Sequence, residues 1–253
     1  MNNFSFYDDV EALEKYLNLP KGALNNIPIY ARKPAVDAII KVKEMEKASL
    51  FRPGLYYIVL VDLCSNTAFN AKYGDKEGDV RTQWFHTAVI ESIGEIALRN
   101  YVAFSKTIGD ASLIIFSSFL DVVEWSDQLT KNLSALSDEY SQRAYEEHDH
   151  LDEAEIEALV SAFSLRARRL VHLGEVSFKE AIDPLSLAVS QTFKIEKYFA
   201  ETDLGCTEAV AQVAKPKLLE AKLGLVENTE VAIPGLSEKV MTYYLKHNVS
   251  PTN

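Results

Sequence analysis

The pattern of apolar and polar positions divides the chain into a helical start and a longer segment of alternating strands and helices. Apolar residues recur at helical spacing in residues 8–17 and again in residues 34–50, where Pro34 stands near the first turn. The pattern then changes, because Tyr56–Leu63 is aromatic or β-branched at nearly every position, as is typical of a buried strand. We therefore predict an N-terminal helical extension over residues 1–50 and one domain over residues 51–253.

The rest of the chain continues this alternation. A turn-rich loop over residues 70–79 leads to a predicted helix over 80–100, with Asp79 as its cap. Two short strands, 101–106 and 112–116, form a hairpin-like pair, and a second amphipathic helix follows over 119–142. A strand around Gly174, a third helix over 184–200 and a strand near residue 246 complete the pattern. This order predicts an α+β sandwich with helices on one face of a largely antiparallel sheet.

Composition narrows the class of protein. The formal net charge of −11 argues against a nucleic-acid partner, which requires a basic face. No apolar run approaches the ~20 residues that span a bilayer, and the N-terminus lacks the features of a signal peptide. Two cysteines, Cys64 and Cys206, form no disulfide framework. We expect a cytoplasmic protein that has no membrane segment.

Much of the acidity is local. From Asp138 to Glu157, nine of twenty residues are Asp or Glu, which predicts a solvated helix end and loop. His148 and His150 flank Asp149 there, and a metal site is the alternative interpretation, although their spacing fixes no geometry.

Two aspartates stand at the ends of predicted strands. Asp62 closes the apolar run "YYIVLVDLCSNTAF", and Asp110 precedes the buried strand in "KTIGDASLIIF". Two carboxylates on adjacent strand ends suit a pair of divalent ions, Mg²⁺ or Mn²⁺, which bind carboxylates together with substrate phosphate oxygens. The alternative is that each aspartate only caps a turn.

Five segments in order resemble the catalytic domain of class III nucleotidyl cyclases, the adenylate and guanylate cyclases. They are "VDLCSNT", "KTIGDASLIIF", "RRLVHLGEV", "LAVSQTFKIE" and "IPGLSEKVMTYYL", and the resemblance extends from about Leu55 to Leu245. It implies a ferredoxin-like class III cyclase domain. It also implies attack of the ribose 3′-oxygen on the α-phosphorus of a nucleoside triphosphate, with release of pyrophosphate and with two divalent ions at each site.

The resemblance assigns roles by position. Asp62 and Asp110 match the two metal-binding aspartates, and the backbone carbonyl of Leu63 matches a further metal ligand. Arg168 matches a basic residue that contacts the triphosphate, and Lys106 matches the residue that reads the base in adenylate-making members.

Several positions depart from the family. Its transition-state asparagine and arginine are Ser190 and Lys194 here, and Lys194 lacks the bidentate fork of arginine. The glycine of its first motif is Ser65, and a triphosphate-binding lysine near the end is replaced by Pro234. The resemblance therefore implies Ser190 and Lys194 as catalytic residues that replace the usual pair.

Base selection remains open at this point. If the register holds, Asp183 lies opposite Lys106 as a second base-reading residue, and a donor with an acceptor suits adenine or cytosine. Tyr57, with Tyr56, is a candidate wall of the substrate pocket, and packing in the core is the alternative.

The altered helix motif and a short arm after "HLGEV" resemble the pyrimidine cyclases of bacterial anti-phage (Pycsar) systems. This resemblance implies cyclic UMP or cyclic CMP as product, with UTP favoured and CTP possible, and a separate effector that the cyclic nucleotide activates. It also implies a homodimer whose two sites each combine the aspartates of one subunit with the helix residues of the other. The alternatives are an ordinary adenylate cyclase and a catalytically inactive module for dimerisation or nucleotide sensing.

Overall fold

A computed structural model describes residue 14, residues 21–22 and residues 53–97, 102–179, 183–199, 203–233 and 239–247. The chain divides into two units, Met1–Arg52 and Pro53–Asn253. Almost all of the predicted helical extension lies outside the described residues, so the division at residue 50 stays a prediction.

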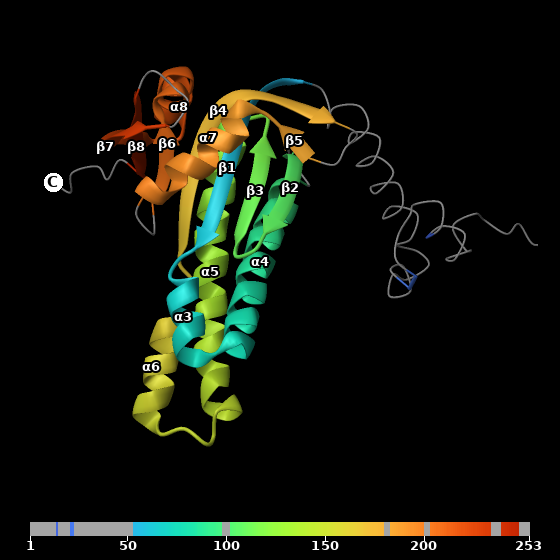
Figure 1. Cartoon of the computed structure of the whole chain (residues 1–253), viewed down its shortest axis with the longest axis vertical. Helices are drawn as coiled ribbons and strands as arrows, with labels where there is room; N and C mark the ends of the chain where they lie inside the picture. The colour runs from blue at the N-terminus through green and yellow to red at the C-terminus, as the bar shows by residue number, and fades with distance from the viewer. Residues whose placement is uncertain are drawn as a thin grey trace, which may run out of the picture. The chain divides into compact units, whose positions relative to one another are not determined.

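The second unit is built on one sheet, which Figure 1 shows with helices around it. The sheet order is β2-β3-β1-β4-β6-β8-β7, and a short strand, β5, pairs with β4. The strands are β1 (Gly54–Leu63), β2 (Val102–Ile108), β3 (Ala111–Phe116), β4 (Ala167–Lys179), β5 (Asp183–Leu185), β6 (Leu204–Thr207), β7 (Leu223–Ala232) and β8 (Lys239–His247). Only the pairing of β4 with β6 is parallel, so the predicted α+β fold with a largely antiparallel sheet is confirmed.

Seven helices accompany this sheet in the described part of the second unit. They are α3 (Asn66–Tyr73), α4 (Asp75–Ala97), α5 (Phe119–Glu147), α6 (Glu153–Phe163), α7 (Leu187–Ile195), α8 (Glu208–Val213) and α9 (Lys215–Glu220), with a 3-10 turn, η2 (Glu196–Tyr198), after α7. Within the ranges that the structure describes, no helix combines the length and the apolar character needed to cross a bilayer.

The two faces of the sheet carry different helices. On one face, alternate residues of β1 share the main core with the long helices α4 and α5, through Val59, Val61, Leu63, Phe85, Val89, Val122 and Trp125. On the other face, Leu170 of β4 packs with Ile195 at the end of α7. A side chain on Gly174 would place its Cβ 2.2 Å from that of Ala188, so glycine lets α7 lie directly on β4. The expectation that all helices lie on one face is therefore wrong.

The region between β1 and α4 also differs from its prediction. Residues 70–79, predicted as a loop, hold the end of α3 and the start of α4. Gly74 ends α3 with a φ of 91°, a conformation that glycine adopts readily. Gly78, read as a turn residue, lies inside α4 and leaves room for the side chain of Asn70. The glycines mark one sharp turn and one close contact, and the rest of the segment is helical.

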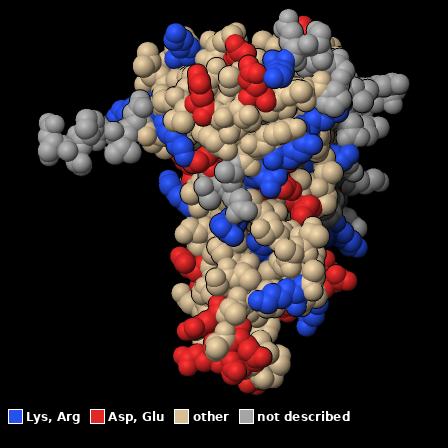
Figure 2. Space-filling view, turned by 60° about the vertical axis from the view of Figure 1, so that its left-hand side comes forward, with Lys and Arg blue, Asp and Glu red and all other residues tan. Residues whose placement is uncertain are grey.

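The acidic stretch is solvated, as predicted, but it also begins a helix. Figure 2 shows acidic side chains gathered at the lower end of the molecule, where α5 passes into α6. Asp152 caps α6, since its carboxylate accepts from the backbone N–H of Glu155 at 2.8 Å and Glu155 returns the bond. His148 lies 4.0 Å from Glu77, and His150 lies 4.0 Å from Asp149. Among the described residues no group of three or more His, Cys, Asp or Glu side chains is placed to hold a metal ion, so these histidines form no such group with Asp149.

Candidate active site

The sheet places Asp62 and Asp110 side by side. Asp62 is the penultimate residue of β1 and pairs with Ala111 of β3, the residue that follows Asp110. The backbone N–H of Leu63 donates to the carbonyl oxygen of Asp110 at 3.1 Å. Gly109, with a φ of 63°, forms the tight turn between β2 and β3 that delivers Asp110. Two carboxylates far apart in sequence thus meet at one end of the sheet.

The carboxylates of this site repel one another. Burial, followed by the charges of Glu196 and Asp110, raises the pKa of Asp62 to about 6, against an opposing effect of Arg168. Burial likewise raises the pKa of Glu196, and the charge of Asp110 adds to that shift. Bringing like charges together in a half-buried place is unfavourable unless a cation neutralises them.

The donor atoms fit a hard divalent cation. Among the described residues no group of three or more His, Cys, Asp or Glu side chains forms a complete metal cage. Mg²⁺ ordinarily binds through one or two carboxylates and takes its remaining ligands from water and substrate phosphates. Asp62, Asp110 and the carbonyl of Leu63 are such a partial set, so these residues fit Mg²⁺ or Mn²⁺, and their role as ligands stays a prediction.

Arg168 lies beside Asp62 but is engaged by a residue that the sequence analysis missed. Arg168 pairs with Asp62 in the register of β4 and β1, and its Nη1 donates to Oε1 of Glu196 at 2.7 Å. The carboxylate of Glu196 follows the C-terminal end of α7, where a negative charge opposes the helix dipole. That placement is the one feature of the sequence that sets Glu196 apart, and it does not identify Arg168 as the partner.

Lys106 lies on the same sheet face as Asp62. It pairs with Leu113, which pairs with Leu60, and Leu60 stands two residues before Asp62 on β1. The side chain of Lys106 is exposed on that face. The register therefore places Lys106 on the sheet face that carries Asp62, and its role as a base-reading residue stays a prediction.

The backbone of Asp183 belongs to β5, which pairs with the far end of β4. The rings of Phe104 and Phe178 lie 6.3 Å apart, so this hairpin comes close to β2 two residues before Lys106. The side chain of Asp183 lies outside the described residues, as does Pro234. The pairing of Asp183 with Lys106 stays a prediction.

The side chains of Ser190 and Lys194 point away from the sheet that carries Asp62 and Asp110. Both are exposed on α7, whose Ala188, Thr192 and Ile195 face the sheet instead. The hydroxyl of Ser190 makes only a long contact, 3.5 Å, with the carbonyl of Ser186.

Tyr57 lies away from the candidate site. It stands five residues before Asp62, so strand alternation directs it to the opposite face of the sheet. There its ring lies 5.7 Å from that of Phe119, against the main core. The interpretation of Tyr57 as a substrate-pocket wall is corrected to core packing.

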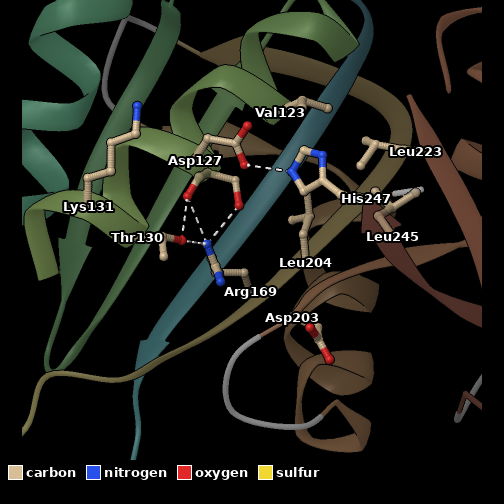
Figure 3. A pocket seen from close by; sticks show the side chains of 11 residues that line it. Val123, Asp127, Thr130, Lys131, Arg169, Asp203, Leu204, Leu223, Leu245 and His247 are labelled. Carbon is tan, nitrogen blue, oxygen red and sulfur yellow. Dashed lines mark hydrogen bonds and ion pairs between the residues drawn. The ribbon is translucent and has the colours of Figure 1, made fainter. Parts of the chain in front are cut away.

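A separate pocket of about 400 Å³ lies between α5 and the β6–β8 part of the sheet (Figure 3). Its Arg169 is buried and donates to the carbonyl and hydroxyl oxygens of Ser126, both at 2.8 Å. Because Arg169 and Arg168 are neighbours on β4, they point to opposite faces. This pocket therefore contains none of the predicted site residues.

Replacing Asp62 with asparagine is expected to stabilise the metal-free protein at neutral pH, by roughly 1 kcal/mol once solvent screening of a half-exposed group is allowed for. The folded-state pKa of about 6 exceeds the ordinary 3.8, so the stability that Asp62 contributes is present below about pH 4 and lost as the pH rises through 6. Asparagine has no such loss. Urea unfolding with a chelator should show the gain at neutral pH and none below pH 4.

Excess Mn²⁺ is the control, because a ligand that binds only the native wild type should reverse the order of stability. An Asp62→Asn variant that is no more stable than wild type at neutral pH in chelator would contradict the electrostatic account of this site.

Comparisons with known proteins identify the fold. No protein-family model and no curated protein matches the sequence. Among solved structures, adenylate cyclases from Trypanosoma brucei superpose with a TM-score of 0.56 at 20% identity, covering 78% of this chain and 89% of theirs. The guanylyl cyclase Cya2 superposes with a TM-score of 0.56 at 14% identity, covering 80% of this chain and 97% of its own. The adenylyl cyclase CyaB from P. aeruginosa superposes with a TM-score of 0.52 at 10% identity, covering 77% of this chain and 95% of its own.

At these identities the comparisons establish the fold. The second unit of the chain has the fold of class III adenylate and guanylate cyclase domains, as the resemblance in sequence predicted.

Proposed function

Since a class III cyclase fold here carries two adjacent carboxylates at one sheet end, we propose that the chain is a metal-dependent nucleotidyl cyclase. Its substrate is a pyrimidine nucleoside triphosphate, UTP favoured and CTP possible, and its products are the 3′,5′-cyclic monophosphate and pyrophosphate. The observation that supports the activity most strongly is the adjacency of Asp62 and Asp110, with Leu63 bonded to the Asp110 carbonyl.

The reaction forms a bond between the ribose 3′-oxygen and the α-phosphorus and breaks the bond from that phosphorus to the pyrophosphate oxygen. The proton of the 3′-hydroxyl leaves to solvent. Asp62, Asp110 and the carbonyl of Leu63 would hold Mg²⁺ or Mn²⁺, which lowers the pKa of the attacking hydroxyl and neutralises charge on the phosphates. Lys106 donates to the base, and Arg168 stabilises the negative charge of the triphosphate.

The ion pair of Arg168 with Glu196 gives this proposal a specific feature. Arg168 has five N–H donors, and the bond to Glu196 uses only one of its nitrogens. A triphosphate can therefore bind the guanidinium of Arg168 while Glu196 remains bonded to it. The bond to Glu196 keeps that guanidinium oriented toward the aspartates.

The exposed positions of Ser190 and Lys194 support a homodimer with shared sites. On one chain these side chains face away from the sheet that carries Asp62. A second copy can present its own Ser190 and Lys194 to that sheet, and a two-fold pair then has two equivalent sites.

The proposed biological role is synthesis of a pyrimidine second messenger in the cytoplasm, in anti-phage defence, with a separate effector that the cyclic nucleotide activates. The altered helix residues Ser190 and Lys194 support this reading. The same two residues also support a second candidate, an inactive cyclase-like module that binds nucleotide without converting it. An ordinary adenylate cyclase is the third, and Lys106 is compatible with it.

The test is incubation of the purified chain with ATP, GTP, CTP or UTP in the presence of Mn²⁺, followed by chromatographic identification of products. We expect a cyclic pyrimidine nucleotide. Cyclic AMP as the sole product would replace the pyrimidine assignment with an adenylate cyclase. No product from any nucleotide, with wild type indistinguishable from Asp110→Ala, would favour the inactive module.

A further inference from the structure

Helix α4 contacts both turns that carry the candidate metal ligands. Arg81 of α4 bonds the turn that follows Asp62 and Leu63, and His86 of the same helix bonds the turn that contains Asp110. These contacts lie on the face of the sheet opposite to α7. One rigid element therefore touches both sources of carboxylate.

Arg81 is among the most deeply buried side chains described, with 1% of its surface exposed. Its guanidinium donates to the carbonyls of Cys64 at 3.0 Å, Ser164 at 3.1 Å and Phe163 at 3.0 Å, and to Oδ1 of Asn66 at 3.2 Å. Burial lowers the pKa of Arg81 to about 10. A buried cation is tolerated only where acceptors surround it, so this set of carbonyls must keep its arrangement while the protein is folded.

The segment that Arg81 holds is an unusual turn. Ser65, which occupies the family's glycine position, has a φ of 59° and a ψ of 21°, in the left-handed region that side chains other than glycine rarely adopt. The Cys64 carbonyl and the Asn66 side chain on either side of Ser65 both accept from Arg81, and Nδ2 of Asn66 donates to Thr82 of α4 at 3.2 Å. Contacts on both sides hold the turn in this conformation.

His86 holds the second turn in the same way. Its Nε2 lies 2.8 Å from the carbonyl of Gly109, and its Nδ1 lies 3.3 Å from the hydroxyl of Ser112. In the tautomer protonated on Nε2, His86 donates to Gly109 and accepts from Ser112. The two bonds lie on either side of Asp110, so one imidazole holds the Gly109 backbone before that carboxylate and the Ser112 side chain after it.

We propose that α4 sets the placement of the two metal-binding carboxylates, with Arg81 and His86 as the positioning residues for the Asp62 turn and the Asp110 turn. This inference rests on the proposed metal-dependent function. Neither side chain touches substrate or ion in this scheme, and each acts through backbone that it fixes. Groups that orient metal ligands commonly change metal affinity by ~10- to 100-fold when they are removed.

The test is Mn²⁺ binding to the full chain, measured from the electron paramagnetic resonance signal of the free ion and accompanied by thermal unfolding. His86→Phe, which keeps a ring but removes both bonds, is expected to raise the Kd for Mn²⁺ about 10-fold. His86→Gln, whose amide can still donate to Gly109, should raise it less. Ser112→Ala, which removes one of the two bonds, is a second variant should His86→Phe fail to fold.

Ser92→Ala is the matched control on the same helix. Ser92 is buried and accepts from Asn132 of α5 at 2.9 Å, so its removal weakens the packing of α4 at a distance from both turns. We expect Ser92→Ala to lower the Tm and leave the Kd for Mn²⁺ unchanged. A folded His86→Phe variant with wild-type Kd and lowered Tm would overturn the positioning role.

The proposed function and this inference fail separately. Wild type that binds Mn²⁺ through Asp110 but converts no triphosphate would refute the cyclase, while the His86 comparison would still decide the role of α4. Wild type that cyclises a nucleotide, with the same Mn²⁺ affinity in the His86 variants, would refute only the inference. Wild type with no Mn²⁺ binding that depends on Asp110 would overturn both.

Discussion

Asp110→Asn is expected to reduce nucleotide cyclisation at least ~1000-fold, because metal-ion stabilisation of the transition state contributes several kcal/mol and each 1.36 kcal/mol is tenfold in rate. Asparagine keeps the size of the side chain and removes its charge. The turn should survive the change, since Gly109 and the Leu63 N–H to Asp110 carbonyl bond belong to the backbone. Initial rates at saturating Mn²⁺, measured by separation of the cyclic product, are the readout.

Asp127→Asn makes the same chemical change outside the candidate site. Asp127 lies on α5 at the separate pocket, 3.3 Å from His247, on the other face of the sheet from Asp62. The turnover of the Asp127→Asn variant should equal that of wild type. A fully active Asp110→Asn variant would remove the metal site from the mechanism, and equal loss in both variants would indicate a general loss of folding.

The proximity of Asp62 and Asp110 was predictable from the sequence because it depends on the local pattern of apolar residues. Each aspartate ends or precedes a run of buried β-formers, and a hairpin joins the two strands next to Asp110. Once β3 pairs with β1 in this register, strand geometry places Asp62 and Asp110 next to each other. The same register explains why Leu63, the next residue of β1, lies beside Asp110.

Other features depend on contacts that no local pattern records. The ion pair of Glu196 with Arg168 joins η2 to β4 and links two residues 28 positions apart that meet because α7 packs on the sheet. Gly78 was predicted as a turn residue, yet it lies inside a helix, where glycine is needed because the side chain of Asn70 occupies the space that a Cβ would take. Tyr57 was misassigned although strand alternation alone was enough to separate it from Asp62.

The candidate metal ligands and the candidate helix residues lie on different elements of the fold. Asp62, Asp110 and Arg168 gather on the sheet, whereas Ser190 and Lys194 face outward on α7. A monomer with this arrangement has metal ligands at one place and helix residues at another. In the proposed dimer the two sets act together across the interface, and that makes the assignment directly testable.

Two inactive variants, Asp110→Asn and Lys194→Ala, are expected to recover activity when they share a dimer. Each mixed dimer has one intact site of two, so we expect the isolated mixed dimer to give about half of wild-type turnover. Co-expression with two different affinity tags isolates the mixed dimer for assay. The matched control pairs Asp110→Asn with Asp62→Asn, which damages both sites and should recover nothing. Mixed dimers of the first pair with no activity, or a fully active Lys194→Ala variant alone, would contradict shared sites built from α7 of the second copy.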